Sequence, residues 1–260
     1  ITVFIFILLT GSQCFAQGST IDFDRWLKAF RKDALAAGIS GVTLDKSLSQ
    51  VQLLSWVIDA DRNQPEFKKS LQMYLDGVLS QKRIERGRLK LAENRQLLTR
   101  IGNKYAVQPR FIVALWGIET YYGKHTGKVP IIDALVTLAY DGRRSKYFRK
   151  ELLNALKIID AGHIDYARMK GSWAGAMGQV QFMPSSFLNY AVDGNNDDRI
   201  DLWQTPEDYL SSAANYLAKM GWQDKQTWGR EVKLPNGFDS GLFNGERLPL
   251  SEWQKKGVRR

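Results

Sequence analysis

Apolar side chains recur every three or four residues along most of the chain, which is the spacing of helices that bury one face. The pattern is clearest in residues 22–37, DFDRWLKAFRKDALAA, and it stops at Gly38. Further helices are predicted at residues 40–49, 67–79, 80–105, 131–142, 146–162 and 206–220. Alternation typical of strands is scarce before the tail at residues 229–238. We therefore predict a predominantly α fold.

One segment within this helical pattern stays ambiguous. Residues 51–67, VQLLSWVIDADRNQPEF, carry apolar positions that match neither spacing, and Pro65 interrupts the run. A strand and a loop both fit, and periodicity does not decide between them. The chain has no internal repeat or low-complexity segment. Its 260 residues are long enough for one large domain or two closely packed ones.

The stretch FIVALWGIETYYGKHTG, residues 111–127, predicts a helix of a different kind. Pro109 suits the first helical position, where no hydrogen bond is lost, and Gly123 suits the end. Nearly every turn between them is apolar on all sides. A helix that is apolar all round is expected to be buried rather than to lie on the surface.

Glu119 stands inside that apolar stretch and is the only acidic residue between Glu93 and Asp133. Burial favours the neutral form of a carboxyl group, so its pKa is expected to rise to where it can act as a general acid. The plainer alternative places Glu119 at an exposed helix end, or pairs it with Lys124 or Arg110. Most carboxylates have such ordinary roles, so this helix alone does not decide the function.

The charge balance of the chain indicates an anionic partner. Lys and Arg number 37 against 27 Asp and Glu, a net charge of +10, and this favours nucleic acid, a membrane surface or an acidic polymer. Basic residues cluster at 82–90, 143–150 and 255–260, although such runs are usually solvated helix faces. Eight Trp and ten Tyr could stack on sugars or bases, but core packing accounts for most aromatic residues.

The first residues, ITVFIFILLTGSQCFAQG, read as the apolar core of a secretory signal peptide. A small-x-small cleavage site spans residues 14–16, and the segment is too short for a stable membrane span. Cys14, the single cysteine, lies in this segment, so the mature protein would have none. A lipidated cysteine is the competing reading, but residues 11–13, Gly-Ser-Gln, fit its motif poorly. We expect a signal peptide at 1–17 and a soluble exported protein.

A glycine-rich stretch, GSWAGAMGQVQFMPSS at residues 171–186, is the second informative region. Its glycines permit close approach of another chain segment or a ligand. Gln179 and Gln181 can donate and accept hydrogen bonds, as hydroxyl-rich substrates require. The alternative is a turn that packs tightly against a helix.

Oxygen-bearing residues follow at residues 189–210 with the spacing of an EF-hand-like loop. Positions one, three, five, seven and nine fall on Asp193, Asn195, Asp197, the carbonyl of Arg199 and Asp201. The sixth position, usually glycine, is Asp198, and the twelfth, usually Glu, is Gln204. A late carboxylate would have to come from Glu207 or Asp208. An Asx-rich turn without a cation is an equal alternative.

Four motifs in order resemble the lytic murein transglycosylase B family, whose soluble or lipid-anchored enzymes cut the glycan strands of bacterial peptidoglycan. They read WGIETYYG, IIDALVTLAYDGRRSKYF, GSWAGAMGQVQFMPSS and VDGNNDDRIDLWQTPEDYLSSAANYL, within a likeness that extends over residues 23–230. The resemblance implies a predominantly α (α+β lysozyme-like) fold: a helical catalytic domain with an EF-hand-like loop and a groove for alternating N-acetylglucosamine and N-acetylmuramic acid.

The resemblance also assigns roles to residues at matching positions. It implies that Glu119 is the catalytic acid and base, and that the substrate contacts Tyr74, Ser172, Gln181 and Tyr216. Gln179 stands where many relatives have an aromatic residue, and we place it with the substrate-binding residues as a hydrogen-bonding group. The family loop often reads D-x-D-G-D-G and here reads DGNNDD. A structural Ca²⁺ or Na⁺ on Asp193, Asn195, Asp197, Arg199 and Asp208 is therefore an expectation, and no cofactor is required for the chemistry.

A single carboxylate suits lytic chemistry better than hydrolysis. Most glycoside hydrolases need two carboxylates, and we find no second one in a setting comparable to that of Glu119. A lytic transglycosylase cuts the β-1,4 bond between N-acetylmuramic acid and N-acetylglucosamine with one. Protonated Glu119 donates to the glycosidic oxygen, the substrate's acetamido group assists, and the carboxylate then deprotonates the C6 hydroxyl, which closes a 1,6-anhydro ring.

Two alternatives remain beside this reading. A lysozyme-type hydrolase would use water in place of the C6 hydroxyl, and a non-catalytic scaffold would bind peptidoglycan without cutting it. Nucleic-acid binding would explain the charge, but the export signal argues against it and no recognition motif is present. We expect a periplasmic monomer that acts on glycan strands and contacts cell-wall synthesis proteins, with outer-membrane anchoring the weaker option. The expected domains are 18–235 and 236–260, the latter the start of a truncated C-terminal segment.

Overall fold

The computed structural model describes residues 14–63, 70–225, 229, 231–242, 244–245 and 247–260. They form two compact units, one that ends at Trp222 and one from Gln223 to Arg260. Of the expected signal peptide, residues 1–13 lie outside the described residues, and the first helix begins at Cys14. The domain division expected from the sequence stays a prediction.

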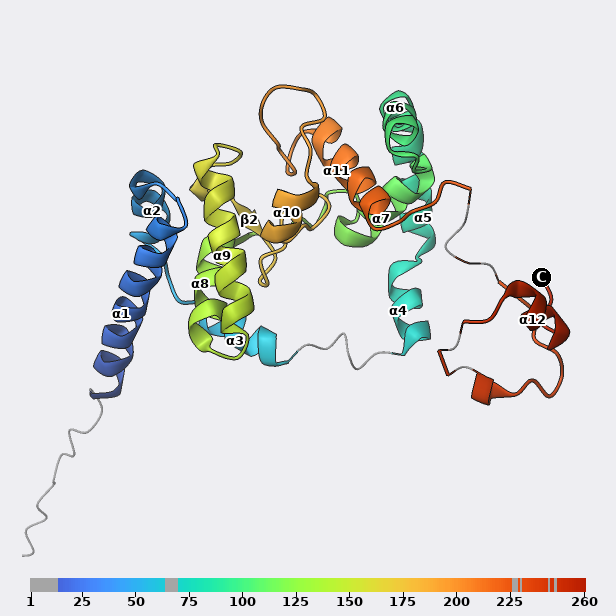
Figure 1. Ribbon diagram of the computed structural model, residues 1–260, viewed down its shortest axis with the longest axis horizontal. Helices are drawn as coiled ribbons and strands as arrows, with labels where there is room; N and C mark the ends of the chain where they lie inside the picture. The colour runs from blue at the N-terminus through green and yellow to red at the C-terminus, as the bar shows by residue number, and fades with distance from the viewer. Residues whose placement is uncertain (1–13, 64–69, 226–228, 230, 243, 246) are drawn as a thin grey trace, which may run out of the picture. The chain divides into compact units, whose positions relative to one another are not determined.

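The first unit is built almost entirely of helices, which confirms the predicted fold class (Figure 1). These are α1 (Cys14–Ala36), α2 (Gly41–Leu48), α3 (Ser55–Arg62), α4 (Leu71–Val78), α5 (Gln81–Glu93), α6 (Arg95–Tyr105), α7 (Pro109–Thr120), α8 (Ile131–Asp141), α9 (Ser145–Asp160), α10 (Pro184–Tyr190) and α11 (Pro206–Lys219). The one sheet in the described residues pairs β1 (Val129–Pro130) antiparallel to β2 (Lys170–Gly171). A 3-10 turn, η2, covers Tyr166–Arg168.

Two sequence-based expectations need correction. Residues 51–67 were expected to be strand or loop, but α3 occupies the middle of this segment. Its buried Asp61 accepts hydrogen bonds from Arg143 and Arg144, a long-range contact that local periodicity does not reveal. The helix expected at 80–105 is broken at Asn94, whose side-chain amide donates to the carbonyl of Lys90 at 2.9 Å and ends α5.

The core forms where two groups of helices bury their apolar faces. In one, α8 lies beside α9 (Figure 1), and every α8 residue from Ile131 to Ala139 is buried. In the other, α7 packs against α5, α6 and α11. The short helix α10 contacts both α9 and α11 and so joins the groups. No helix in the described residues combines the length and hydropathy needed to cross a membrane.

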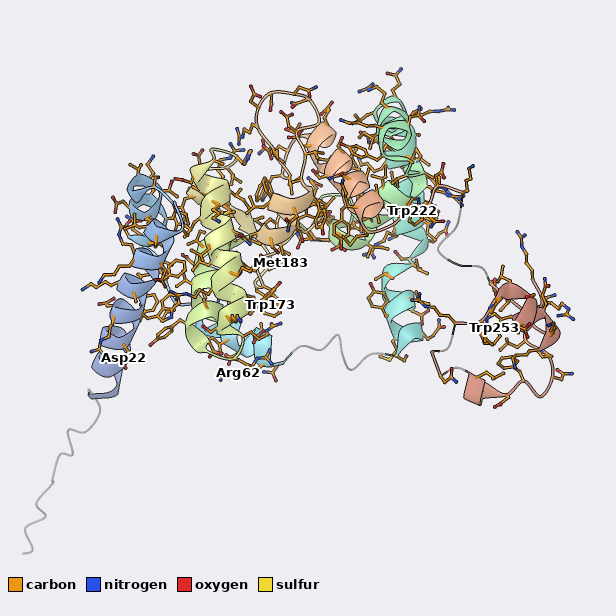
Figure 2. All side chains as sticks on the ribbon, viewed as in Figure 1. Asp22, Arg62, Trp173, Met183, Trp222 and Trp253 are labelled. Carbon is orange, nitrogen blue, oxygen red and sulfur yellow. The ribbon has the colours of Figure 1, made fainter. Side chains whose placement is uncertain are left out.

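The second unit contains little regular structure. It has a 3-10 turn, η3 (Ser240–Leu242), and helix α12 (Leu250–Lys255), whose Trp253 is labelled in Figure 2. The strand-like alternation at residues 229–238 produces only an isolated bridge between Lys233 and Arg259 in the described part of this unit. Phe238 packs against Trp253 with ring centroids 6.5 Å apart.

Candidate active site

Helix α7 carries Glu119 in its last turn. The helix begins at Pro109 as predicted, but it ends at Thr120, because Tyr121 takes a left-handed conformation with φ of 53° before Gly123 is reached. The expected burial on all sides is wrong for one face, since Ala114 and Ile118 are exposed. That face borders a cavity of about 270 Å³ between α5 and α7, which Glu119 does not line.

The carboxyl group of Glu119 is accessible to solvent and unpaired. Within residues 14–63 and 70–225 it makes no side-chain hydrogen bond or ion pair, and the expected alternatives, Lys124 and Arg110, lie instead over the rings of Tyr121 and Phe111. Burial nevertheless raises the pKa of Glu119. Water touches the group, but the protein around it displaces enough solvent to disfavour the charge. The direction is the one expected from the sequence.

Both ends of α7 are fixed in place. At its start, Trp222 (Figure 2) packs against Phe111 with ring centroids 4.4 Å apart and donates to the side chain of Gln108 at 3.1 Å. At its end, Trp116 and Thr120 lie one turn apart on the same face. A side chain between these anchors, such as Glu119, is therefore held on a rigid element.

Gln179 makes the connection at the end of α7. Its amide oxygen accepts from the indole N–H of Trp116 at 2.7 Å, and its backbone carbonyl accepts from the hydroxyl of Thr120 at 2.7 Å. Its amide NH₂ donates to the carbonyl of Trp203 at 3.0 Å. Gly123 has φ of 82°, which favours glycine, and a Cβ there would also displace this amide. The sequence did not predict the roles of Thr120 and Trp203. A polar Thr inside an apolar helix was the one feature that could have indicated the contact of Thr120.

The glycine-rich stretch forms a tight turn against its own chain. A Cβ on Gly171 would collide with the carbonyl of Ala176, and one on Gly178 with the backbone of Leu202. The Ser172 hydroxyl accepts from the backbone N–H of Ala176 at 3.0 Å. The close packing that the sequence offered as the alternative is therefore present, and the hydroxyl hydrogen of Ser172 remains available to a ligand.

Gln181 is held by the same turn. Its backbone is left-handed, with φ of 50°, and its amide NH₂ donates to the carbonyls of Thr126 at 3.1 Å and Gly178 at 2.9 Å. Both amide hydrogens are thus engaged, and the amide oxygen is the atom that a substrate hydroxyl could reach. The two hydrogen bonds therefore fix the direction in which this oxygen points.

The two predicted tyrosines differ in their surroundings. Tyr216 is half-buried between Phe182 and Tyr190, with ring centroids 5.5 and 5.2 Å away, so it lies next to the glycine-rich turn. Tyr74 lies on α4 and is 47% exposed, and within the described residues no side-chain contact joins it to Glu119 or to the turn. Gln179, Gln181 and Tyr216 are therefore connected through the glycine-rich turn, and Gln179 contacts α7 beside Glu119, whereas no such contact is described for Tyr74.

The EF-hand-like loop is closed by its own backbone. Asp193 accepts from the backbone N–H groups of Asn196 at 2.6 Å and Asp198 at 2.8 Å. Asp198, at the position usually held by glycine, is left-handed with φ of 64°. In the described residues no three His, Cys, Asp or Glu side chains are arranged to hold a metal. The donors suit a hard cation, but their arrangement is that of an Asx-rich turn.

Asp208 closes the loop from the first turn of α11. Its carboxylate accepts from the backbone N–H groups of Gly194 at 2.8 Å and Asp201 at 2.7 Å. Burial raises the pKa of Asp208, and the negative charges of Asp193 and Asp197 raise it further against those hydrogen bonds. Several carboxylates therefore lie close together in this loop, and Arg199, which is 3.8 Å from Asp201, balances only part of their charge.

Comparisons with known proteins agree with these features. The family model described as Transglycosylase SLT domain matches residues 22–260. Membrane-bound lytic murein transglycosylase B of Escherichia coli (strain K12) is 42% identical over 156 residues, which are 59% of this chain and 42% of that protein.

Solved structures extend the likeness to the fold. SltB3 from Pseudomonas aeruginosa, in complex with NAG-NAM-pentapeptide, is 46% identical with a TM-score of 0.88, over 91% of this chain and 63% of that one. Escherichia coli Slt35 in complex with calcium is 32% identical with a TM-score of 0.75, over 89% and 74%. The chain thus spans less than two thirds of the first two relatives. The resemblance seen in the four motifs is confirmed, and the chain belongs to the family of Transglycosylase SLT domain proteins.

Proposed function

We propose that this chain is a lytic transglycosylase that cuts the β-1,4 bond between N-acetylmuramic acid and N-acetylglucosamine and leaves a 1,6-anhydromuramic end. The observation that carries the proposal is the state of Glu119. Its carboxyl group is accessible, has no partner among the described residues and has a raised pKa, on a helix fixed at both ends. Two other carboxyl groups with raised pKa values, Asp133 and Asp208, are only 7% and 0% exposed. A polymeric substrate cannot reach them, which supports chemistry with a single carboxylate.

The raised pKa suits both halves of the reaction. Protonated Glu119 gives its proton to the glycosidic oxygen as the bond to C1 breaks, and the substrate's acetamido group assists at C1. The resulting carboxylate takes the proton of the C6 hydroxyl, whose oxygen then bonds to C1. Glu119 ends protonated, as it began, and no water is consumed. A pKa near the working pH serves a group that must act first as acid and then as base.

The proposed substrate is a glycan strand that still carries its peptides. SltB3 was solved with NAG-NAM-pentapeptide and with NAG-anhNAM-pentapeptide, and this chain has a TM-score of 0.88 to each. The net charge of +10 suits an anionic polymer. We further propose that the protein works in the periplasm as a soluble monomer. Outer-membrane anchoring is the alternative, since one relative is described as membrane-bound.

Product analysis tests this activity. Purified peptidoglycan digested with the protein should yield muropeptides with anhydro ends, lighter by one water than reducing-end products, when measured by mass spectrometry. Reducing ends alone would identify a hydrolase. Binding to peptidoglycan without release of any fragment would identify a scaffold, and either result would refute the proposed activity.

We also propose that the loop at residues 193–201 takes up a hard cation such as Ca²⁺, which would relieve the crowding of its carboxylates. The support is the oxygen donor set and a calcium complex of Slt35. At neutral pH, Ca²⁺ at ten times its Kd should raise the Tm by about 5 °C. Asp193→Asn should lose this response, whereas Asp165→Asn, outside the loop, should keep it. An unchanged Tm in scanning calorimetry would leave the loop as a plain Asx turn.

A further inference from the structure

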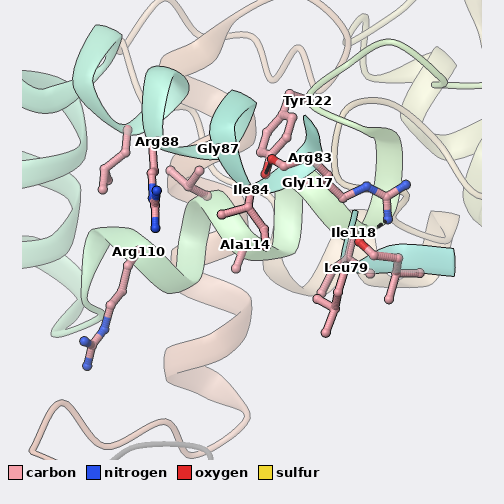
Figure 3. A pocket seen from close by; sticks show the side chains of 13 residues that line it. Leu79, Arg83, Ile84, Gly87, Arg88, Arg110, Ala114, Gly117, Ile118 and Tyr122 are labelled. Carbon is pink, nitrogen blue, oxygen red and sulfur yellow. Dashed lines mark hydrogen bonds between the residues drawn. The ribbon is translucent and has the colours of Figure 1, made fainter. Parts of the chain in front are cut away.

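The turn that follows α7 is held in an uncommon backbone conformation. Tyr121, Tyr122 and Gly123 are all left-handed, with φ of 53°, 58° and 82°. For a tyrosine this costs of order 1–3 kcal/mol, so the surroundings must enforce it. The Tyr122 hydroxyl donates to the carbonyl of Arg83 at 3.0 Å, and its ring fills the space that a Cβ on Gly87 or Gly117 would need (Figure 3).

This turn presents the ring of Tyr121 to three cations. The guanidinium carbons of Arg83 and Arg86 lie 5.1 and 5.4 Å from the ring centroid, and the Lys124 ammonium lies 5.8 Å away. We call Arg83, Arg86, Tyr121 and Lys124 the Tyr121 cluster. Cation–π attraction offsets the repulsion among the three charges only in part, at roughly 0.5–1 kcal/mol each for exposed sites.

The Tyr121 cluster lacks a counter-charge within residues 14–63 and 70–225. None of its three cations pairs with an Asp or Glu there, although Arg83 donates to the carbonyl of Val78 at 3.0 Å. The Nε atoms of Arg83 and Arg86 are buried and have no hydrogen-bond partner in these residues. Converging cations with buried, unsatisfied donors favour the binding of an anion.

We propose that the Tyr121 cluster binds a carboxylate of the peptide attached to muramic acid, next to the bond that Glu119 cuts. This rests on the proposed function and names the part of the substrate that the cluster recognises. Tyr121 is two residues from Glu119. In a peptide-bearing strand the lactyl carboxyl of muramic acid is used up in the amide bond to the peptide, so the sugars contribute no charge. A peptide held by its amino end finishes in a free carboxylate, and guanidinium groups match the planar geometry of that group.

The same helix offers a matched control. Figure 3 shows Arg83 at the end of the α5–α7 cavity where Leu79 and Ile118 lie, whereas Arg88 lies toward the opposite end. Arg88 and the exposed Lys82 belong to α5 but not to the Tyr121 cluster. Lys82→Gln/Arg88→Gln therefore removes the same charge as Arg86→Gln/Lys124→Gln. Arg83 is left intact because of its bond to Val78.

The test compares three substrates: peptide-bearing murein, the same murein with its carboxylates amidated, and strands stripped of peptide, which keep the lactyl carboxylate. Cleavage kinetics are measured beside co-sedimentation with each murein, so that binding is read independently of chemistry. Arg86→Gln/Lys124→Gln should raise the KM for peptide-bearing murein about tenfold with kcat unchanged. Amidation of the murein should raise the KM of the wild type by the same factor and leave the KM of the variant unchanged. The Lys82→Gln/Arg88→Gln control should behave as wild type.

The outcomes separate the alternatives. If Arg86→Gln/Lys124→Gln lost affinity equally for amidated and untreated murein, or if the control variant lost affinity for both, the effect would be general charge attraction. Either result would overturn the proposal. A loss greatest on stripped strands would assign the Tyr121 cluster to the lactyl carboxylate and also overturn it. A wild type that binds murein in a carboxylate-dependent way but releases no anhydro ends would instead refute the proposed catalytic function and leave the recognition site standing.

Discussion

Glu119→Gln should abolish the release of anhydro-muropeptides, with a fall in kcat of at least about 10³-fold. General acid–base catalysis contributes typically 10²–10⁴-fold, and here one side chain supplies both the acid and the base. Glutamine keeps the size and hydrogen-bonding shape of glutamate but cannot transfer a proton. The measurement is quantification of anhydro ends by mass spectrometry after single time points on purified murein.

A matched variant controls for the loss of one negative charge. Glu85 is exposed on α5, where its carboxylate accepts from Gln81 at 2.9 Å, and Glu85→Gln keeps that acceptor. It should retain wild-type turnover. Turnover by Glu119→Gln within tenfold of wild type would refute the catalytic assignment, and co-sedimentation with murein would show whether the inactive variant still binds substrate.

Glu119→Gln should also stabilise the folded protein, because the pKa of Glu119 is raised from the ordinary value of 4.5. Stability linked to a raised carboxyl pKa is fully present below the unfolded-state value and is lost as pH rises through the folded-state value. Glutamine does not ionise and escapes this loss. The Tm gain of Glu119→Gln should therefore be near zero below pH 4.5 and grow toward neutral pH. A gain independent of pH would contradict the raised pKa.

Local patterns were sufficient for the helices that bury one continuous face. Residues 22–37 and 206–220 became helical as expected because their apolar spacing follows the helix they form. Residues 51–67 were missed, since α3 depends on Asp61 and its arginine partners some eighty residues away. The end of α7 was misplaced because the left-handed turn begins at Tyr121, two residues before Gly123, in a conformation that tertiary contacts of Tyr122 enforce.

The candidate site shows the same division. Glu119 stood out because one carboxylate in an apolar helix is visible in the letters alone, and the raised pKa follows from that setting. What holds Glu119 could not be read in this way. Gln179 looks like any polar residue of a glycine-rich turn, and only the fold brings its amide to Trp116 and Trp203. Sequence identifies the chemical group more readily than the residues that position it.

Gln179→Ala should lower kcat by about 10–100-fold, the second-largest effect we expect. Truncation removes the acceptor of the Trp116 indole N–H and the donor to Trp203, and so leaves the last turn of α7 held from this segment only by the bond of Thr120 to the backbone carbonyl of residue 179. Small displacements of a catalytic group can cost about 10²-fold. The free energy of unfolding should also fall by roughly 2 kcal/mol, because the indole N–H of the buried Trp116 loses its partner. The fall in kcat is measured at a temperature at which circular dichroism shows that the variant is folded.

The distribution of this loss between kcat and KM decides what Gln179 does. Because both the oxygen and the NH₂ of its side-chain amide are engaged, we infer that Gln179 positions α7, so kcat should fall while KM stays near the wild-type value. A direct substrate contact would mainly raise KM instead. Trp116→Phe removes the same hydrogen bond from the other side, so the double variant should lose little more than Gln179→Ala alone. Gln204→Ala serves as the control. Gln204 is exposed and lies two residues after Leu202, whose carbonyl accepts from the backbone N–H of Gln179, and its substitution should leave both constants unchanged. Additive losses would mean that the two side chains act independently, and the positioning role would fall.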